Sequence, residues 1–257
     1  NALQVKKTMK IGVVPARLNS VRLPRKILAD LNGKPLIAHV MERALEAKSL
    51  DKVILAVDSE ETIKTLEQYN FDMVLTSSDH VSGTDRIAEV IDEIPDAEII
   101  INIQGDEPLI EADVIDSLVD SFNDSTVNIA TIVSTKLTVS DLLNPNVVKA
   151  IVNEHQDAIE FKRNIFDLEI GGVYRHVGIY GFRRESLIAF TRLGPSAREV
   201  ESRLEQLRAL DNGMPIRATV TNYDSHSVDT QADLDKVARI MDMAGVVSDG
   251  DNQNEKV

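Results

Sequence analysis

The apolar run Ile99–Ile103, with the polar turn after it, restricts the fold more than any other part of this chain. It leads directly into Gln104–Pro108, a Q-G-D-E-P sequence. A continuous apolar run ending at a Gly/Pro turn is typical of a central strand covered on both faces. In open α/β sheets, ligands bind beyond the carboxyl ends of such strands. The pattern thus places Asp106 where a carboxylate can hold a metal ion, although an ordinary strand-ending turn uses the same residue types.

Strands alternate with amphipathic helices through the first half of the chain. Besides the run above, strands are predicted at Lys10–Pro15, Lys52–Val57, Asp72–Leu75 and Asn128–Ser134. Repeated strand–helix units favour parallel neighbours and helices on both faces of one sheet. We therefore expect an α/β fold with a mostly parallel, doubly wound sheet.

The alternation changes after Thr138. Strands are predicted at Val147–Val152, Tyr174–Arg183 and Pro215–Val220, and Ala158–Asn164 is expected to be extended or loop-like. Gly171-Gly172 predicts a turn. Two further helices are predicted, a long one at Arg198–Leu210 and the last at Gln231–Ala244.

The composition excludes several classes of protein. The 257 residues carry a net charge of −14, which argues against non-specific binding to nucleic acid or to anionic membranes. The absence of Cys excludes disulfides and thiolate chemistry. No apolar run approaches the roughly 18 residues of a membrane-spanning helix, and there is no signal-peptide core. We expect a cytoplasmic protein with a single domain over residues 9–246, with residues 1–8 and 247–257 flexible or added to it.

Two polar loops are candidates for ligand binding. Ala16–Lys26 concentrates Arg and Lys residues after the first strand, which suggests a phosphate site, although a solvated basic loop would look the same. Thr76–Arg86 is rich in hydroxyls and carries Gly83 before a helix. Such a loop suits a base or a phosphate, but Ser82 or Thr84 is equally suited to cap the helix.

Four loops follow predicted strands, and several of them can share one edge of a doubly wound sheet; they are Ala16–Lys26, Thr76–Gly83, Gln104–Pro108 and Asp224–Thr230. The first brings cations, and two others bring Asp106 and Asp229. Cations with two carboxylates suit a nucleoside triphosphate with Mg²⁺, which takes oxygen ligands from carboxylates and phosphates. The sequence lacks the P-loop and dinucleotide-binding glycine patterns, zinc-ligand spacing and the G-x-S-x-G of serine hydrolases.

An ordered set of motifs carries a family resemblance. They are P-A-R-x-x-S-x-R-L-P-x-K at Pro15–Lys26, N-G-K-P at Asn32–Pro35, S-G-T-D-R at Ser82–Arg86, Q-G-D-E-P at Gln104–Pro108, N-P-N-x-V-K at Asn144–Lys149, H-x-G-I-Y-G at His176–Gly181, L-E-Q-L-R at Leu204–Arg208 and V-D-T at Val228–Thr230. The chain resembles the 3-deoxy-manno-octulosonate cytidylyltransferase family from Met9 to about Met243. The resemblance implies a nucleotide-diphospho-sugar-transferase-like fold with a smaller lobe in the C-terminal half for sugar binding and dimerisation. It also implies a homodimer that acts in lipopolysaccharide synthesis.

The resemblance assigns roles residue by residue. The enzyme would couple CTP to 3-deoxy-manno-octulosonate (Kdo) or a close analogue, with Mg²⁺ as cofactor. The residues implied to bind CTP are Ala16, Arg17, Ser20, Arg22, Lys26, Thr76, Ser77 and Ser82; those implied to hold the sugar acid are Gln104, Arg163, His176, Tyr180, Glu205 and Gln206. Asp106 and Asp229 would bind the metal and, with Arg17 and Lys26, carry catalysis. Without the family, Glu205 and Gln206 would fit one polar face of an amphipathic helix.

The sequence departs from the family pattern in three places. Arg25 replaces the usual Gly in the first loop, where its side chain would narrow the loop or add a cation. After Arg163 the usual S-R-x-x-I-P is K-R-N-I-F-D, with Lys162 for Ser and Asp167 for Pro, and Ser202 replaces a customary Glu. The link to His176 also looks shorter. These changes leave two alternatives open, which are the same chemistry on an amino-substituted or sialic-acid-like sugar, and a non-catalytic nucleotide-binding relative.

Overall fold

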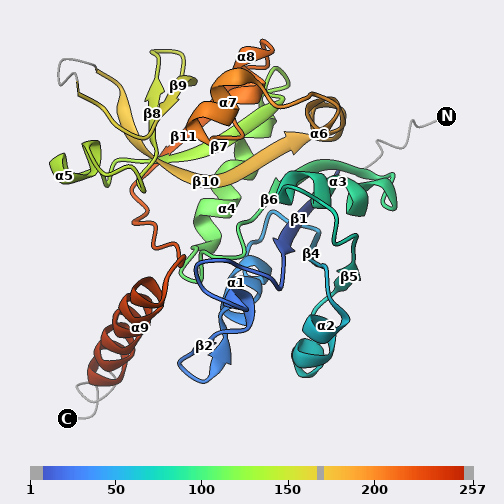
Figure 1. Cartoon of the computed structure of the whole chain (residues 1–257), viewed down its shortest axis with the longest axis vertical. Helices are drawn as coiled ribbons and strands as arrows, with labels where there is room; N and C mark the ends of the chain where they lie inside the picture. Colours follow the sequence, from blue (N-terminus) through green and yellow to red (C-terminus); the bar gives the residue numbers. More distant parts are fainter. Residues whose placement is uncertain (1–7, 167–170, 252–257) are drawn as a thin grey trace.

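The computed structural model describes residues 8–166 and 171–251. A nine-stranded sheet with the order β5-β4-β1-β6-β10-β7-β11-β9-β8 crosses the molecule (Figure 1). Its strands are β1 (Met9–Ala16), β4 (Lys52–Val57), β5 (Met73–Leu75), β6 (Ala97–Asn102), β7 (Ile129–Ser134), β8 (Lys149–Val152), β9 (Asp157–Lys162), β10 (Val173–Arg183) and β11 (Ile216–Thr221). A small second sheet pairs β2 (Asp30–Leu31) with β3 (Lys34–Pro35). The expected α/β fold around a central sheet is confirmed.

The β6 strand is central, as its apolar sequence predicts. It lies between β1, to which it is parallel, and β10. Ile100 and Ile101 are both fully buried, but they belong to different hydrophobic clusters, one on each face of the sheet. Because neighbouring strand residues point to opposite faces, a run buried on both faces is apolar at successive positions, as in Ile99–Ile101.

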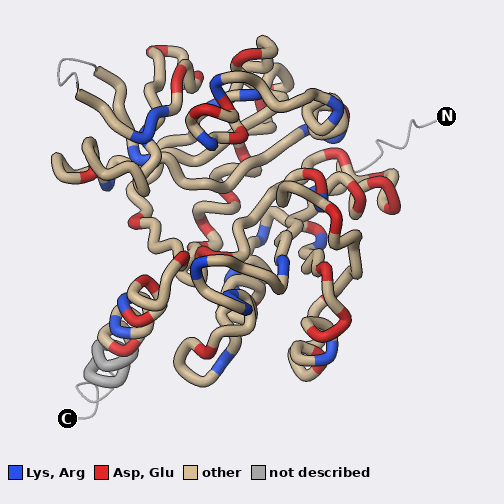
Figure 2. Tube along the Cα trace, in the orientation of Figure 1, with Lys and Arg blue, Asp and Glu red and all other residues tan. Residues whose placement is uncertain are grey.

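Helices cover both faces. One face packs against α1 (Leu36–Leu45), α2 (Glu60–Leu66), α4 (Ala112–Asp120) and α9 (Gln231–Asp251), and the other against α3 (Gly83–Asp92), α6 (Arg184–Thr191) and α8 (Leu207–Asp211). The remaining helices are α5 (Val139–Leu142), α7 (Ala197–Ser202) and the short 3₁₀ turns η1 (Lys26–Leu28), η2 (Glu67–Tyr69) and η3 (Ser121–Asn123). Asp and Glu are spread along α2, α3 and α9 rather than gathered on one of them (Figure 2). Within the described part of the chain, every helix is too short or too polar to traverse a bilayer.

The parallel arrangement holds for β5-β4-β1-β6 and for β7 with β11, whereas β10 is antiparallel to both of its neighbours β6 and β7. The reason is the end of the sheet at which β10 begins. This strand follows the turn at Gly172 and enters the sheet at the end where β6 and β7 finish. At Gly172 (φ +70°) a Cβ would lie 2.3 Å from the carbonyl oxygen of Val152, so this turn requires glycine.

The prediction of one helix over Arg198–Leu210 is wrong, because this segment forms two shorter helices, α7 and α8. α7 ends at Arg203, whose φ of 54° is left-handed, and Leu204 N–H then donates to the carbonyl of Glu199. Across the break, Arg208 donates two hydrogen bonds to the buried Glu199 carboxylate, of 2.9 and 2.5 Å. A buried two-bond pair that joins the two pieces explains why a helical pattern is interrupted here.

Other boundaries moved less. Ala158–Asn164, expected to be extended or loop-like, contains the regular strand β9, which pairs with β8 and β11. The last helix, predicted to end at Ala244, continues to Asp251. Ser59 and Ser82 cap α2 and α3, as the sequence allows. The expectations for residues 1–7 and 252–257, and the replacement at Asp167, fall outside the described residues.

Candidate active site

A first cavity of about 350 Å³ lies beyond the carboxyl ends of β1 and β6. It is lined by nine of the residues chosen from the sequence, which are Ala16, Arg17, Ser20, Arg22, Lys26, Ser82, Gln104, Asp106 and Asp229. Gly105 also lines it, and a Cβ there would be 3.1 Å from the Pro15 carbonyl oxygen. The glycine thus relieves a tight contact between two strand ends. The loops after β1 and β6 and the loop before α9 meet in one cavity, as their shared sheet edge predicts.

Lys26 stands between the two carboxylates of this cavity. Its Nζ donates to Asp106 Oδ2 at 2.9 Å and to Asp229 Oδ1 at 3.1 Å. Burial alone would lower the pKa of the ammonium, but the two carboxylates outweigh it and raise that pKa above its ordinary value. Arg22 also pairs with Asp229 Oδ1, at 2.9 Å. Lys26 therefore stays charged.

The loops that carry these carboxylates are fastened to each other. Val228 N–H donates to the Asp106 carbonyl at 2.8 Å. Glu107, which is 6% exposed, accepts hydrogen bonds from Tyr223 Oη and Ser225 Oγ. Burial raises the pKa of Glu107 to about 7, and the hydroxyls oppose that shift. Glu107 is inside the Q-G-D-E-P motif, yet sequence reasoning did not single it out.

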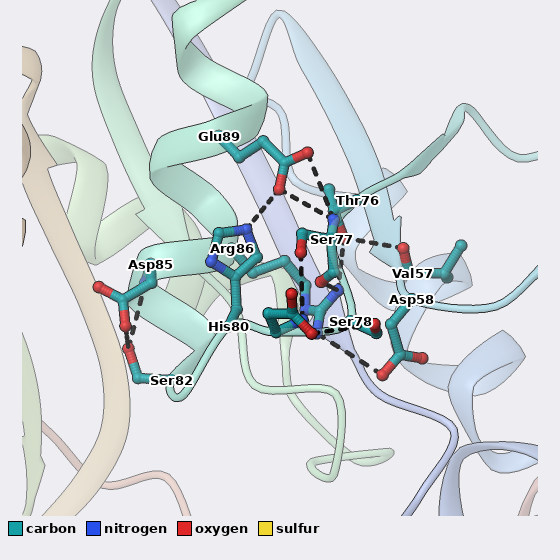
Figure 3. Close-up of polar contacts among 11 residues, drawn as sticks. Val57, Asp58, Thr76, Ser77, Ser78, His80, Ser82, Asp85, Arg86 and Glu89 are labelled. Carbon is teal, nitrogen blue, oxygen red and sulfur yellow. Dashed lines mark hydrogen bonds and ion pairs between the residues drawn. The ribbon is translucent and has the colours of Figure 1, made fainter.

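A polar network lies beside the first cavity and supports its lining residues His80, Ser82 and Arg86 (Figure 3). Arg86, 3% exposed, donates to Thr76 Oγ1 and to the Ser77 carbonyl, and lies 3.6 Å from Asp58. Burial lowers the pKa of Arg86, and the Asp58 carboxylate opposes that shift. Thr76 in turn donates to the Val57 carbonyl. These bonds fix the hydroxyl-rich loop to α3 and β4.

The residues predicted from the sequence to bind CTP in the Thr76–Arg86 loop fall into two groups. Ser82 lines the cavity, whereas Thr76 and Ser77 are not among its lining residues. His80 and Arg86 do line it, and sequence reasoning missed both. His80 contacts the Glu89 carboxylate, which also accepts from Ser77 N–H (Figure 3). The S-G-T-D-R motif already contained the signal for Arg86.

Arg25 does not line the cavity. Its backbone is left-handed, with φ 56°, and its guanidinium pairs with Glu61 of α2. Both possibilities weighed from the sequence, a narrowed loop or an added cation, put its side chain at the phosphate loop. The structure directs it to α2 instead.

A second cavity of about 290 Å³ adjoins the first, since Gln104 and Asp106 line both. His176, Tyr180 and Gln206, also chosen from the sequence, line the second cavity. Tyr180 Oη lies 2.9 Å from His176 Nε2, so residues four apart on β10 do share a face. Burial lowers the pKa of His176 to about 3 and raises that of Tyr180. Both side chains are therefore neutral at pH 7.

The last two residues chosen for the sugar acid lie elsewhere. Glu205 lines a small neighbouring cavity shared with Tyr180 and Gln206, and it accepts a hydrogen bond of 2.9 Å from Thr84 Oγ1. Burial raises the pKa of the Glu205 carboxyl. Arg163 lines an outer cavity, and its guanidinium donates to the carbonyls of Ser202, Arg203 and Pro145 at 2.8, 3.0 and 2.8 Å. The structure does not bring Arg163 to the second cavity.

The carboxylate oxygens of Asp106 and Asp229 are ligands of the kind that a hard divalent cation prefers. No cluster of three or more His, Cys, Asp or Glu side chains in residues 8–166 and 171–251 is arranged to hold a metal ion. Asp106 and Asp229 nevertheless face one position, because a single ammonium bonds to both. One or two carboxylates completed by phosphate oxygens is the usual protein ligand set for Mg²⁺.

Comparison with known proteins identifies the family. The family model described as Cytidylyltransferase matches residues 11–216. A 3-deoxy-manno-octulosonate cytidylyltransferase from Geobacter metallireducens is 41% identical over 246 residues, covering 89% of this chain and 96% of the relative. This chain belongs to the 3-deoxy-manno-octulosonate cytidylyltransferase family. The relative of the same name from Chloroherpeton thalassium is 43% identical over 239 residues, with 89% and 96% coverage.

Solved structures agree with this assignment. A structure of CMP:2-keto-3-deoxy-manno-octonic acid synthetase complexed with CTP superposes with a TM-score of 0.86 at 36% identity, covering 92% of this chain and 99% of that one. The 4-diphosphocytidyl-2C-methyl-D-erythritol synthase of Anaerococcus prevotii shares the fold, with a TM-score of 0.62 at 13% identity over 91% of this chain and 99% of its own. The predicted family and the predicted enzyme class, a nucleotidyltransferase, are confirmed.

Proposed function

We propose that this chain transfers the cytidylyl group of CTP to Kdo or a close analogue, in a Mg²⁺-dependent reaction that releases pyrophosphate. The observation that carries the proposal is the junction of two cavities at Gln104 and Asp106. A reaction between two bound molecules requires their reacting atoms to meet at one place. The similar synthetase solved with CTP supports a nucleotide in one of these cavities.

The first cavity suits the triphosphate. Arg17, Arg22 and Lys26 line it in a protein whose net charge is −14. Cations placed where phosphate charge develops stabilise the transition state of phosphoryl transfer. Ser82 and His80 line the same cavity and would contact the nucleoside end. Thr76 and Ser77 support this loop through the Arg86 network.

The second cavity suits a polar sugar. Gln104, Gln206, His176 and Tyr180 line it, and all four are neutral hydrogen-bonding groups. A mostly buried set of neutral donors and acceptors selects hydroxyl positions, because a ligand lacking one hydroxyl leaves a buried group unpaired. The sugar-acid roles of Arg163 and Glu205 remain predictions of the resemblance.

The proposed chemistry is one displacement at phosphorus. The oxygen of the anomeric 2-hydroxyl forms a bond to the α-phosphorus, the bond from that phosphorus to the leaving phosphate oxygen breaks, and pyrophosphate departs. The hydroxyl proton passes to solvent. When bound at Asp106 and Asp229, Mg²⁺ would neutralise phosphate charge and make the hydroxyl more acidic. Lys26 and Arg17 hold the phosphates, and the second cavity orients the hydroxyl.

Pyrophosphate release from CTP tests the proposal. We expect release with Kdo that requires Mg²⁺ and is abolished by a chelator. An 8-amino analogue and a sialic acid are assayed beside it. Release with one of these but not with Kdo would keep the chemistry and change the acceptor, whereas no release with any of the three would contradict the proposed transfer.

Binding can be measured separately from turnover. CTP with Mg²⁺ should raise the melting temperature of the chain, since a ligand that binds the folded state stabilises it. A raised melting temperature without any pyrophosphate would favour a non-catalytic nucleotide-binding relative. Homodimerisation and a role in lipopolysaccharide synthesis remain predictions of the resemblance.

A further inference from the structure

The second cavity needs a cation, because the acceptor of the proposed reaction carries a carboxylate. Asp106 and Glu107 already line this cavity with acidic groups. Moving a further carboxylate into such a place is unfavourable unless a cation pairs with it. The question is therefore which basic side chain in the described residues can meet it.

Most basic side chains around the two cavities are already engaged. Lys26 pairs with both Asp106 and Asp229, and Arg22 pairs with Asp229. Arg163 donates to three backbone carbonyls at the end of α7 and in the loop before β8. Lys149, fully buried, donates to the carbonyls of Asp141, Asn144, Val147 and Arg163. These contacts hold the protein together.

Arg175 differs from them. It lines the second cavity from β10, directly before His176. Its side chain is 23% exposed, and among residues 8–166 and 171–251 its guanidinium donates no hydrogen bond. Its ion pair with Asp224 spans 3.8 Å, too long for a hydrogen bond. Glu107 and Asp141 also lie within electrostatic reach of Arg175, but among the described residues no acceptor is at hydrogen-bond distance from its guanidinium. A mostly buried arginine side chain with five unused donors is arranged to receive an acceptor.

We infer that Arg175 binds the carboxylate of the sugar acid in the second cavity and that Asp224 is the counterion that this carboxylate replaces. The fork of a guanidinium matches the two oxygens of a carboxylate, so the contact fixes the sugar's orientation as well as its charge. A carboxylate held there leaves the rest of the sugar facing Gln104, His176 and Tyr180. This inference rests on the proposed function and names the residue that selects an acid.

Kinetics of an Arg175→Gln variant test the inference. Losing a charge-assisted bond should raise the KM for Kdo roughly 10- to 100-fold, while the KM for CTP stays close to that of the wild type. Arg217→Gln is the matched control, because Arg217 is similarly exposed (27%) but pairs with Asp157 and Asp124, and it lines neither cavity. The control should change neither KM.

Two further measurements separate recognition from a structural role. Asp224→Asn removes the competing counterion, so it should lower the KM for Kdo, which loss of a structural ion pair would not do. A Kdo analogue with a carboxamide in place of the carboxylate should be a poorer substrate for the wild type, but nearly as good as Kdo for Arg175→Gln. Arg175→Lys, which keeps the charge but loses the fork, should lie between wild type and Arg175→Gln and serves if the glutamine variant does not fold.

Each outcome is decisive. If the wild type releases pyrophosphate with Kdo but Arg175→Gln changes its KM by less than about twofold, or keeps the wild-type preference for acid over carboxamide, the inference is overturned and the proposed function stands. If the wild type releases no pyrophosphate with any sugar acid, the proposed function falls and the inference falls with it.

Discussion

Replacing Arg163 by methionine tests whether this residue stabilises the fold, as a clamp between backbone segments, or binds the sugar acid. Its guanidinium donates three hydrogen bonds, of 2.8, 2.8 and 3.0 Å, to the carbonyls of Ser202, Pro145 and Arg203. Two of these carbonyls end α7, where the helix leaves its last acceptors without partners. Methionine keeps the length of the side chain and removes every donor. The left-handed end of α7 would then lose its fastening to β9 and to the loop before β8.

The size of the effect follows from these contacts. A net contribution of about 1 kcal/mol per hydrogen bond, reduced because water reaches carbonyls near the surface, gives a loss of roughly 2 kcal/mol. For a chain of this size such a loss lowers the melting temperature by about 4–8 °C. Lys162→Met is the control, since Lys162 is the exposed neighbour on β9. Its melting temperature should change little.

Thermal denaturation and steady-state kinetics together decide the question. A clamp predicts a lower melting temperature in Arg163→Met, with the larger part of the loss present before any sugar is added. An unchanged melting temperature combined with a large rise in the KM for Kdo would refute this reasoning, because Arg163 would then act on the substrate. It would also restore the role that the family resemblance gives to this residue.

Further predictions follow from single residues. Asp106→Asn should abolish most turnover while its melting temperature stays near that of the wild type; near-normal rates with Mg²⁺ would contradict its role. At the left-handed Arg25 (φ 56°), glycine should be more stable than alanine by about 1 kcal/mol in denaturant titrations, and equal stabilities would show no strain. Gly172→Ala should destabilise far more than Gly213→Ala, since both have positive φ but only Gly172 has a backbone oxygen within 4 Å of a Cβ. The pKa of His176 is about 3 in the folded chain and 6.5 in the unfolded chain, so burial of its neutral ring carries no penalty above pH 6.5. As the pH falls from 6.5 towards 3, the unfolded chain takes up a proton that the folded chain does not, and the free energy of unfolding decreases. Between pH 6.5 and 5 the wild type should therefore lose about 2 kcal/mol that His176→Gln does not lose, and parallel curves would contradict that burial effect.

Local patterns predicted most of the elements. The apolar run of isoleucines in β6 and the amphipathic helices α1, α3 and α4 follow from sequence patterns alone, because burial on one or two faces leaves a direct trace in the sequence. The direction of β10 and the break after α7 leave no such trace. The first depends on where the chain returns after Gly172. The second depends on Arg163, which acts from outside the predicted helix, and on the Arg208–Glu199 pair, which helical periodicity does not reveal.

The motifs predicted where the site lies better than they predicted which side chains line it and contact one another. The loops carrying Lys26, Asp106 and Asp229 do meet in one cavity, because parallel strands bring their ends to the same edge. His80 was missed because a lone histidine in a polar loop has no distinguishing pattern. Arg175 was missed because its significance depends on which neighbouring cations are already engaged, and sequence spacing does not reveal that.

The position of Lys26 makes ligand binding at this junction an exchange of partners. A divalent cation bound between Asp106 and Asp229 would compete for these carboxylates with the ammonium that now bridges them. The released ammonium is then available to the phosphates in the same cavity. By thermodynamic linkage the effect is reciprocal, so phosphates that draw Lys26 away tighten cation binding by the same factor. Under the proposed function, Lys26 would be the counterion that keeps the two carboxylates together before ligands bind, and it would link nucleotide binding to cation binding.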